Sequence, residues 1–132
     1  MFGFGKKKDK KPRVGTTEDV VLTEEKKEEL LRTISFKKEE LKQSIGENLS
    51  KIYEEIGLAY NELGEEDNAI EALEKSIQEK KTVGDGYKAL LRLYNKKRAE
   101  AAKANDEETL QIYLKKMDQM IQVSKDVTRG VK

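Results

Sequence analysis

The sequence contains no cysteine and no histidine among its 132 residues, and it has a single proline. Without cysteine the chain can form no disulfide, and without histidine it lacks the commonest general base and metal ligand. Proline is the residue that interrupts helices most strongly, and Glu, Lys, Leu and Ala, which favour helices, are abundant. The composition therefore predicts an all-α protein with no cofactor and no catalytic centre built on histidine or cysteine.

Long apolar runs are also missing, since no stretch of about 18 apolar residues is available to span a membrane. The basic N-terminal stretch is not followed by the apolar segment of a secretory signal. We therefore expect a cytoplasmic protein. Acidic clusters at residues 65–67 and 107–108 lie at expected helix starts, where interaction with the helix dipole explains them. No enzyme activity and no metal site are expected from these carboxylates.

The net charge of +1 conceals an uneven distribution along the chain. Residues 1–13 hold six basic residues and one acidic residue, and residues 80–132 have a net charge of +6. Residues 47–79 between them have a net charge of −8. Residues 1–16 show no hydrophobic period and are expected to form a basic disordered tail ahead of a helical domain at 17–132.

Apolar residues recur at helical spacing in five stretches separated by Gly, Asn or Asp. Thr23 and Asp106 are expected N-caps, because each is followed by two glutamates in the first helical turn. Gly64 is expected to end a helix with a positive φ. The last apolar stripe consists of Leu110, Tyr113, Leu114, Met117 and Ile121. About five antiparallel helices are predicted, because short loops favour antiparallel neighbours.

The segment 23–63 allows two interpretations. Ser44 and Glu47 have the spacing of a capping box, which predicts that a second helix starts there. Alternatively, one helix continues through Gly46, because a single glycine costs a helix only about 1 kcal/mol.

A period of 34 residues relates two of the stretches. Tyr53 and Tyr87, Ile56 and Leu90, and Tyr60 and Tyr94 are each separated by this distance. The pattern Tyr53-x-x-Ile56-Gly57-x-x-Tyr60-x-x-Leu63-Gly64 resembles the first helix of a tetratricopeptide repeat. The following Ala69-x-x-x-Leu73 resembles its second helix.

This resemblance covers residues 49–118 and implies a tetratricopeptide-like right-handed superhelix of paired helices. It also implies that Gly57 faces the adjoining helix and that Tyr53 and Tyr60 are largely buried. The match weakens after residue 80, because Leu91 stands where the family has glycine and Lys81 where it has a closing proline.

In this family the first helix of each repeat lines a concave face that binds peptide segments. The resemblance therefore implies a partner-binding face formed by Lys51, Glu54, Leu58 and Asn61 of one helix and by Asp85, Lys88, Arg92 and Asn95 of the next. Lys88, Arg92 and Asn95 share one helix side by spacing alone, and arginine binds carboxylates bidentately, so an acidic peptide is the expected partner. The alternative is a solvated face with surface ion pairs.

The lysine and asparagine clamp that some family members use for chaperone C-termini is absent, because Glu54, Leu58 and Ala89 occupy its positions. The sequence is best interpreted as a non-catalytic adaptor or scaffold that binds a protein or peptide.

A second interpretation is a peripheral membrane-associated or nucleic-acid-associated factor anchored weakly by the basic tail. Because fewer than about three repeats rarely suffice for stability, the open ends of the repeats need a cover. The helix at 23–45 and the extension at 118–127 are candidates, and self-association as a homo-oligomer is the alternative. Met117 and Met120 with Ile121 either fill the core or form an adaptable groove.

Overall fold

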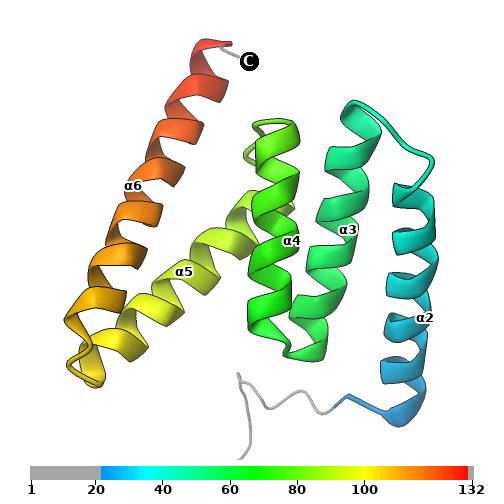
Figure 1. Ribbon diagram of the computed structural model, residues 1–132, viewed down its shortest axis with the longest axis horizontal. Helices are drawn as coiled ribbons and strands as arrows, with labels where there is room; N and C mark the ends of the chain where they lie inside the picture. The colour runs from blue at the N-terminus through cyan, green and yellow to red at the C-terminus, as the bar shows by residue number, and fades with distance from the viewer. Residues whose placement is uncertain (1–21, 131–132) are drawn as a thin grey trace, which may run out of the picture.

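The computed structural model describes residues 22–130, and this part of the chain is all-helical (Figure 1). Its five helices are α2 (Glu24–Leu41), α3 (Glu47–Leu63), α4 (Glu66–Glu79), α5 (Asp85–Lys103) and α6 (Glu107–Arg129). Consecutive helices run in opposite directions, as expected from the short connections (Figure 1). The all-α prediction is therefore confirmed for these residues. None of the described helices is long and apolar enough to cross a membrane.

The predicted basic tail at residues 1–16 lies outside the described residues. The same holds for the first and last residues of the predicted helical domain, 17–21 and 131–132.

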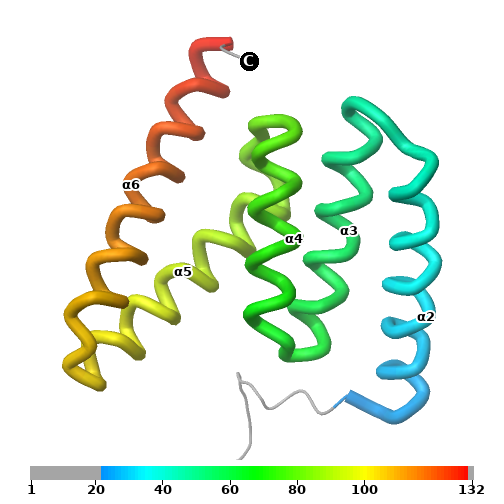
Figure 2. The backbone as a smooth tube through the Cα atoms, in the orientation of Figure 1, coloured from blue at the N-terminus to red at the C-terminus, as the bar shows by residue number. Residues whose placement is uncertain are grey.

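The helices are arranged as a row, with α2 at one end and α6 at the other (Figure 2). In this row α3 contacts α2 on one side and α4 and α5 on the other, and α5 contacts α6. Each interior helix is therefore covered by neighbours on two sides, whereas α2 and α6 each pack on one helix along most of their length.

Three helix ends form as the sequence predicts. The Thr23 side chain accepts a hydrogen bond from the backbone N–H of Lys26 at the start of α2. The Asp106 side chain accepts from the N–H of Thr109 at the start of α6. Gly64 ends α3 with a φ of 81°, a left-handed conformation that favours glycine.

The segment 23–63 forms two helices, but the predicted capping box between Ser44 and Glu47 is wrong. Helix α3 begins at Glu47 with Gly46 as its N-cap, and Gly46 has a φ of 65°. The Ser44 hydroxyl instead donates to the carbonyl of Glu40, at the end of α2. A serine that bonds four residues back satisfies the preceding helix end and cannot cap the following one.

Two hydrophobic clusters form the core, and α4 contributes to both of them. One cluster joins α2, α3 and α4 and consists of Leu30, Ile34, Ile52, Ile56, Ala59 and Ala72. The other joins α4, α5 and α6 and consists of Ala69, Ile70, Leu73, Ala89, Leu90, Leu93, Tyr94 and Met120. Burying a large aliphatic side chain contributes about 1.5–3 kcal/mol, so α4 is held from both directions.

The contact between α3 and α4 is close because Gly57 has no side chain. A Cβ at this position would lie 2.6 Å from Cγ and 3.2 Å from the backbone N of Leu73, a residue with no exposed surface. Gly57 therefore faces the adjoining helix, as predicted. Tyr53 and Tyr60 are both partly buried, and Tyr60 packs against both core clusters, so the prediction that both are largely buried is confirmed in part.

The stripe predicted for the last helix faces the core only in part. Met120 is the single fully buried residue of α6, and Met117 packs against the core cluster. Leu114 and Ile121 are 39% and 52% exposed, so of the residues expected either to fill the core or to form a groove, Met120 fills the core and Ile121 does not. No further described helix packs against α6 on the side where Leu114 and Ile121 lie.

Candidate functional site

A shallow groove of about 340 Å³ lies between α3 and α5. It is lined by Leu58, Asn61 and Glu62 of α3 and by Asp85, Lys88, Ala89 and Arg92 of α5. The apolar part of the lining comes from Leu58 and Ala89, and the remaining residues are polar or charged. The structure therefore brings predicted residues of two different helices to one surface.

Lys88 and Arg92 are one helical turn apart on α5, and both are exposed. Within the described residues neither makes an ion pair or a hydrogen bond through its side chain, whereas their neighbours on the same helix do. Lys96 pairs with Glu66, and Lys97 pairs with Asp67 at 3.2 Å. The cationic groups of Lys88 and Arg92 are thus available to a ligand without breaking an existing contact.

Three of the predicted partner-binding residues do not line this groove. Lys51 is exposed in the first part of α3. The Glu54 carboxylate accepts a hydrogen bond of 2.8 Å from the backbone N–H of Gly86, and it thereby holds the start of α5 against α3. The Asn95 side chain accepts from Nε of Arg98 at 3.0 Å. Glu54 therefore has a structural contact in place of a free carboxylate.

The bond to Glu54 also explains where α5 starts. The sequence places a break at residues 84–86, but the helix already begins at Asp85, so Gly86 lies in its first turn. A Cβ on Gly86 would lie 2.7 Å from Oε2 of Glu54. Glycine is therefore needed here to let the carboxylate reach the backbone.

Besides Ala89, sequence reasoning missed one lining residue, Glu62. It lies one helical turn after Leu58 and next to Asn61, and both of these were predicted. Extending the same helix side by four residues would have found it. Glu62 and Asp85 give the groove two carboxylates beside its two cations, so a ligand must place its acidic groups near Lys88 and Arg92.

A second groove of about 260 Å³ runs between α2 and α4, over α3. The half-buried rings of Tyr53 and Tyr60 line it. The ammonium of Lys75 lies 5.7 Å from the Tyr53 ring centroid, and that of Lys38 lies 5.5 Å from the Tyr60 ring centroid. These cation–π contacts cover the exposed ring faces, which explains why two large aromatic side chains remain at the surface.

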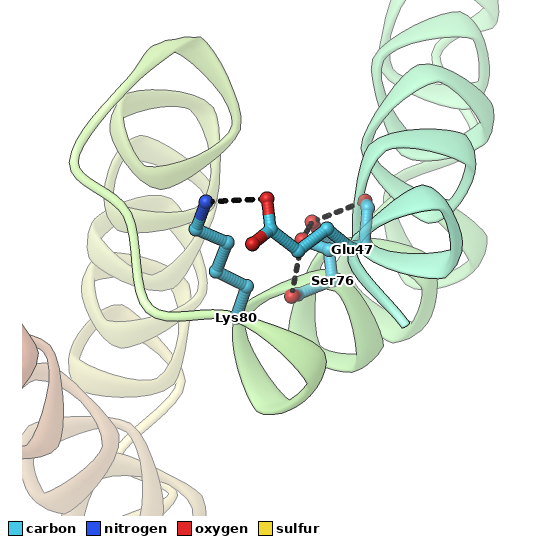
Figure 3. A network of polar contacts seen from close by, with 4 residues as sticks. Glu47, Ser76 and Lys80 are labelled. Carbon is cyan, nitrogen blue, oxygen red and sulfur yellow. Dashed lines mark hydrogen bonds and ion pairs between the residues drawn. The ribbon is translucent and has the colours of Figure 1, made fainter. Parts of the chain in front are cut away.

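A further depression, of about 480 Å³, lies where the end of α4 meets the start of α3 and the end of α6. Both lysines that line it form ion pairs. Lys80 pairs with Glu47 at 2.8 Å (Figure 3). Lys81 pairs with Asp126 of α6 at 2.7 Å. The hydrogen bond from Lys81 lowers the pKa of the Asp126 carboxyl below its ordinary value. This region joins three helices and leaves few unpaired groups for a ligand.

Next to this depression, two buried serines connect α3 to α4. The Ser50 hydroxyl donates to the carbonyl of Ser76 at 2.9 Å, and the Ser76 hydroxyl donates to the carbonyl of Ser50 at 2.8 Å (Figure 3). The two small side chains permit the close approach of the helices and satisfy each other's polar groups there.

Glu74 connects α4 to both later helices. Its carboxylate accepts hydrogen bonds from the hydroxyl of Tyr94 on α5 and from the ammonium of Lys116 on α6. Burial raises the pKa of the Tyr94 hydroxyl above its ordinary value, and the bond to Glu74 raises it further. Together these groups hold three helices together through partly buried polar contacts.

Within the described residues no three acidic side chains gather where they could hold a metal ion. Comparison of the chain with protein-family models, with curated proteins and with solved structures gives no match.

Proposed function

We propose that the protein is a non-catalytic interaction module that binds an acidic segment of a partner protein in the groove between α3 and α5. The observation that carries this proposal is the pair of cations on α5. Lys88 and Arg92 are exposed, share one helix side and have no partner within the described residues. Arginine offers two parallel hydrogen bonds to a carboxylate, and lysine adds a second positive charge within one helical turn.

The resemblance to tetratricopeptide repeats supports the choice of this face over the others. In that family the first helix of each repeat lines the peptide-binding surface, and here α3 and α5 are the corresponding helices. Their direct contact through Glu54 and Gly86 provides a continuous surface of two first helices. Leu58 and Ala89 offer apolar contact for one side chain of the bound segment. We expect this activity in the cytoplasm.

The proposal is tested with the variant Lys88→Glu/Arg92→Glu. Partners captured by the wild-type chain from native lysate are identified, and the affinity of the best one is measured for both proteins. Replacing both cations is expected to lower the affinity by about 10- to 100-fold, because charge-assisted contacts are replaced by repulsion. The affinity for the wild type should also fall as salt rises from about 50 to about 300 mM, since exposed charges are screened over about 10 Å at 0.1 M.

The matched control is Lys103→Glu/Lys115→Glu, which makes the same change in net charge at two exposed lysines outside the groove. This control should bind normally. Equal loss of binding in both variants would show that only overall charge matters, and normal binding by the groove variant would exclude the groove as the interface.

A further inference from the structure

One side of α6 carries an apolar stripe that the other described helices cover only in part, since Met117 also packs against the core cluster. The members of the stripe are Leu110, Leu114, Met117 and Ile121, with spacings of four, three and four residues. Leu114 and Ile121 are exposed, and Leu110 and Met117 are half-buried. This alternation of four and three residues is the pattern with which one helix packs along another.

The opposite end of the helix row is different. Helix α2 exposes Leu31 and Phe36, but these two lie on different sides of the helix among charged residues. They therefore form no stripe. Helical arrays need polar outer faces at their ends to stay soluble and unassociated. The α2 end has isolated exposed apolar residues, whereas the α6 end has a continuous apolar stripe. The stripe on α6 is therefore the surface where we expect another protein chain to bind.

We propose that this stripe is the interface of a homodimer in which α6 packs antiparallel against α6 of a second copy. The stripe is complementary to itself under two-fold symmetry. With the axis between Lys115 and Lys116, Leu110 lies opposite Ile121 of the second copy, and Leu114 lies opposite Met117. All four layers are then apolar, as an interface between identical helices requires.

The charges that flank the stripe favour the same register. Residues at the edge of the stripe are Gln111, Asp118 and Lys125, which together carry no net charge. In the proposed register Gln111 lies opposite Asp118 of the second copy, where an amide can donate to a carboxylate. In the register shifted by one heptad, Asp118 would lie opposite Asp118 of the second copy and Leu114 would lie opposite Ser124. Two like charges would then face each other, and a leucine would face a polar side chain.

The expected dimer is weak. The stripe covers about 17 Å of helix at 1.5 Å per residue, so the contact falls below the roughly 1,200 Å² of a standard interface. A Kd between about 1 μM and 1 mM is therefore expected. Sedimentation of the full chain across that concentration range should show a shift from monomer to twice the monomer mass. A chain that stays monomeric at the highest concentration would overturn the proposal.

The variant Leu114→Lys/Ile121→Lys should raise the Kd of the dimer by at least about 10-fold, because two charges enter its apolar layers. Both residues are exposed in the monomer, so the helix content should stay the same. The matched control is Leu31→Lys/Phe36→Lys at the α2 end, which should dimerise as the wild type does. Dimerisation of the α6 variant at wild-type strength, or equal loss in the control, would overturn the proposal.

The orientation is tested by cross-linking, because the natural sequence has no cysteine. A mixture of Gln111→Cys and Asp118→Cys chains should form the mixed disulfide dimer several-fold faster than either variant forms a dimer alone. Faster self-linking of each variant would indicate parallel helices and overturn the antiparallel arrangement. This interface uses no residue of the α3–α5 groove, so loss of one function leaves the other measurable.

Discussion

The helix pair α3–α4 and the helix pair α5–α6 have the same connectivity but are held together differently. In the first pair each helix has five buried residues, and the backbones approach closely through Gly57, Ala69 and the two serines. In the second pair α5 has six buried residues, but the 23-residue α6 has only Met120. An apolar stripe is buried only where a neighbour is available, and α6 has a described neighbour on one side alone.

The polar contacts differ in the same way. Helices α3 and α4 exchange two short hydrogen bonds between buried serines and carbonyls. Helix α6 is fixed by longer side chains, with Tyr87 donating to the carbonyl of Met120 and Lys116 donating to Glu74. Interior pairs in this protein are therefore stabilised by close packing, and the terminal helix by polar side chains that span a wider separation.

The largest effect is expected when one leucine is removed from the second helix of each pair. Leu73→Ala should reduce the free energy of unfolding by about 2–5 kcal/mol, because Leu73 has no exposed surface and a cavity would remain. Leu114→Ala should change it by less than about 0.5 kcal/mol in the monomer. Urea unfolding at low protein concentration measures both values. Equal losses would mean that the two pairs are packed alike.

The second effect concerns the close contact in the first pair. Gly57→Ala should destabilise the protein by about 1–3 kcal/mol, because the new Cβ would overlap the side chain and backbone of Leu73. Helix propensity alone predicts the opposite sign, with a gain of about 1 kcal/mol. Thermal and urea unfolding decide the sign, and a more stable variant would show that the helices can separate without penalty.

A smaller effect is expected for the buried serines. Ser50→Ala should cost about 1 kcal/mol, the net value of one hydrogen bond. The carbonyl of Ser76 keeps a partner, because it also accepts from the backbone N–H of Lys80. A loss above about 3 kcal/mol would indicate that a buried group is left without a partner. The double variant with Ser76→Ala should show less than twice the single effect, because the two hydroxyls contact each other.

The smallest effect is expected for Tyr94 in the second pair, and it depends on pH. Tyr94→Phe should cost about 0.5 kcal/mol near neutral pH, because Glu74 keeps its bond to Lys116. The pKa of the Tyr94 hydroxyl is raised in the folded state, so its contribution to stability is complete below the ordinary value of about 10 and is lost as pH rises further.

The measurement is the urea midpoint of wild type and Tyr94→Phe at about pH 8 and about pH 11. The difference between the two proteins should shrink or change sign at the higher pH. A difference that stays constant would contradict the assigned cause of the raised pKa.

Several local features follow from the sequence because they depend on neighbouring residues alone. Thr23, Gly64 and Asp106 end or begin helices as predicted, since a cap needs only a suitable side chain or a tolerated φ within one turn. The contact of Gly57 with the next helix was also predicted from the sequence, because a glycine in a helix interior indicates close packing at that position. The groove residues Asn61, Lys88 and Arg92 were found from helical spacing together with the family resemblance.

Other features were decided by tertiary structure. Leu114 and Ile121 match the core pattern as well as Met120 does, and only the position of α5 determines which of them is buried.

From the sequence, Glu54 is interpreted as a free surface carboxylate. In the structure the start of α5 lies against it, and the carboxylate accepts a hydrogen bond from the backbone of Gly86. Tyr53 and Tyr60 are only partly buried, and Lys75 of α4 and Lys38 of α2 lie over their rings. The sequence by itself determined where helices form, since that depends on local spacing and caps. Which helix faces are covered depends on partners distant in the chain, and only the packed structure supplied them.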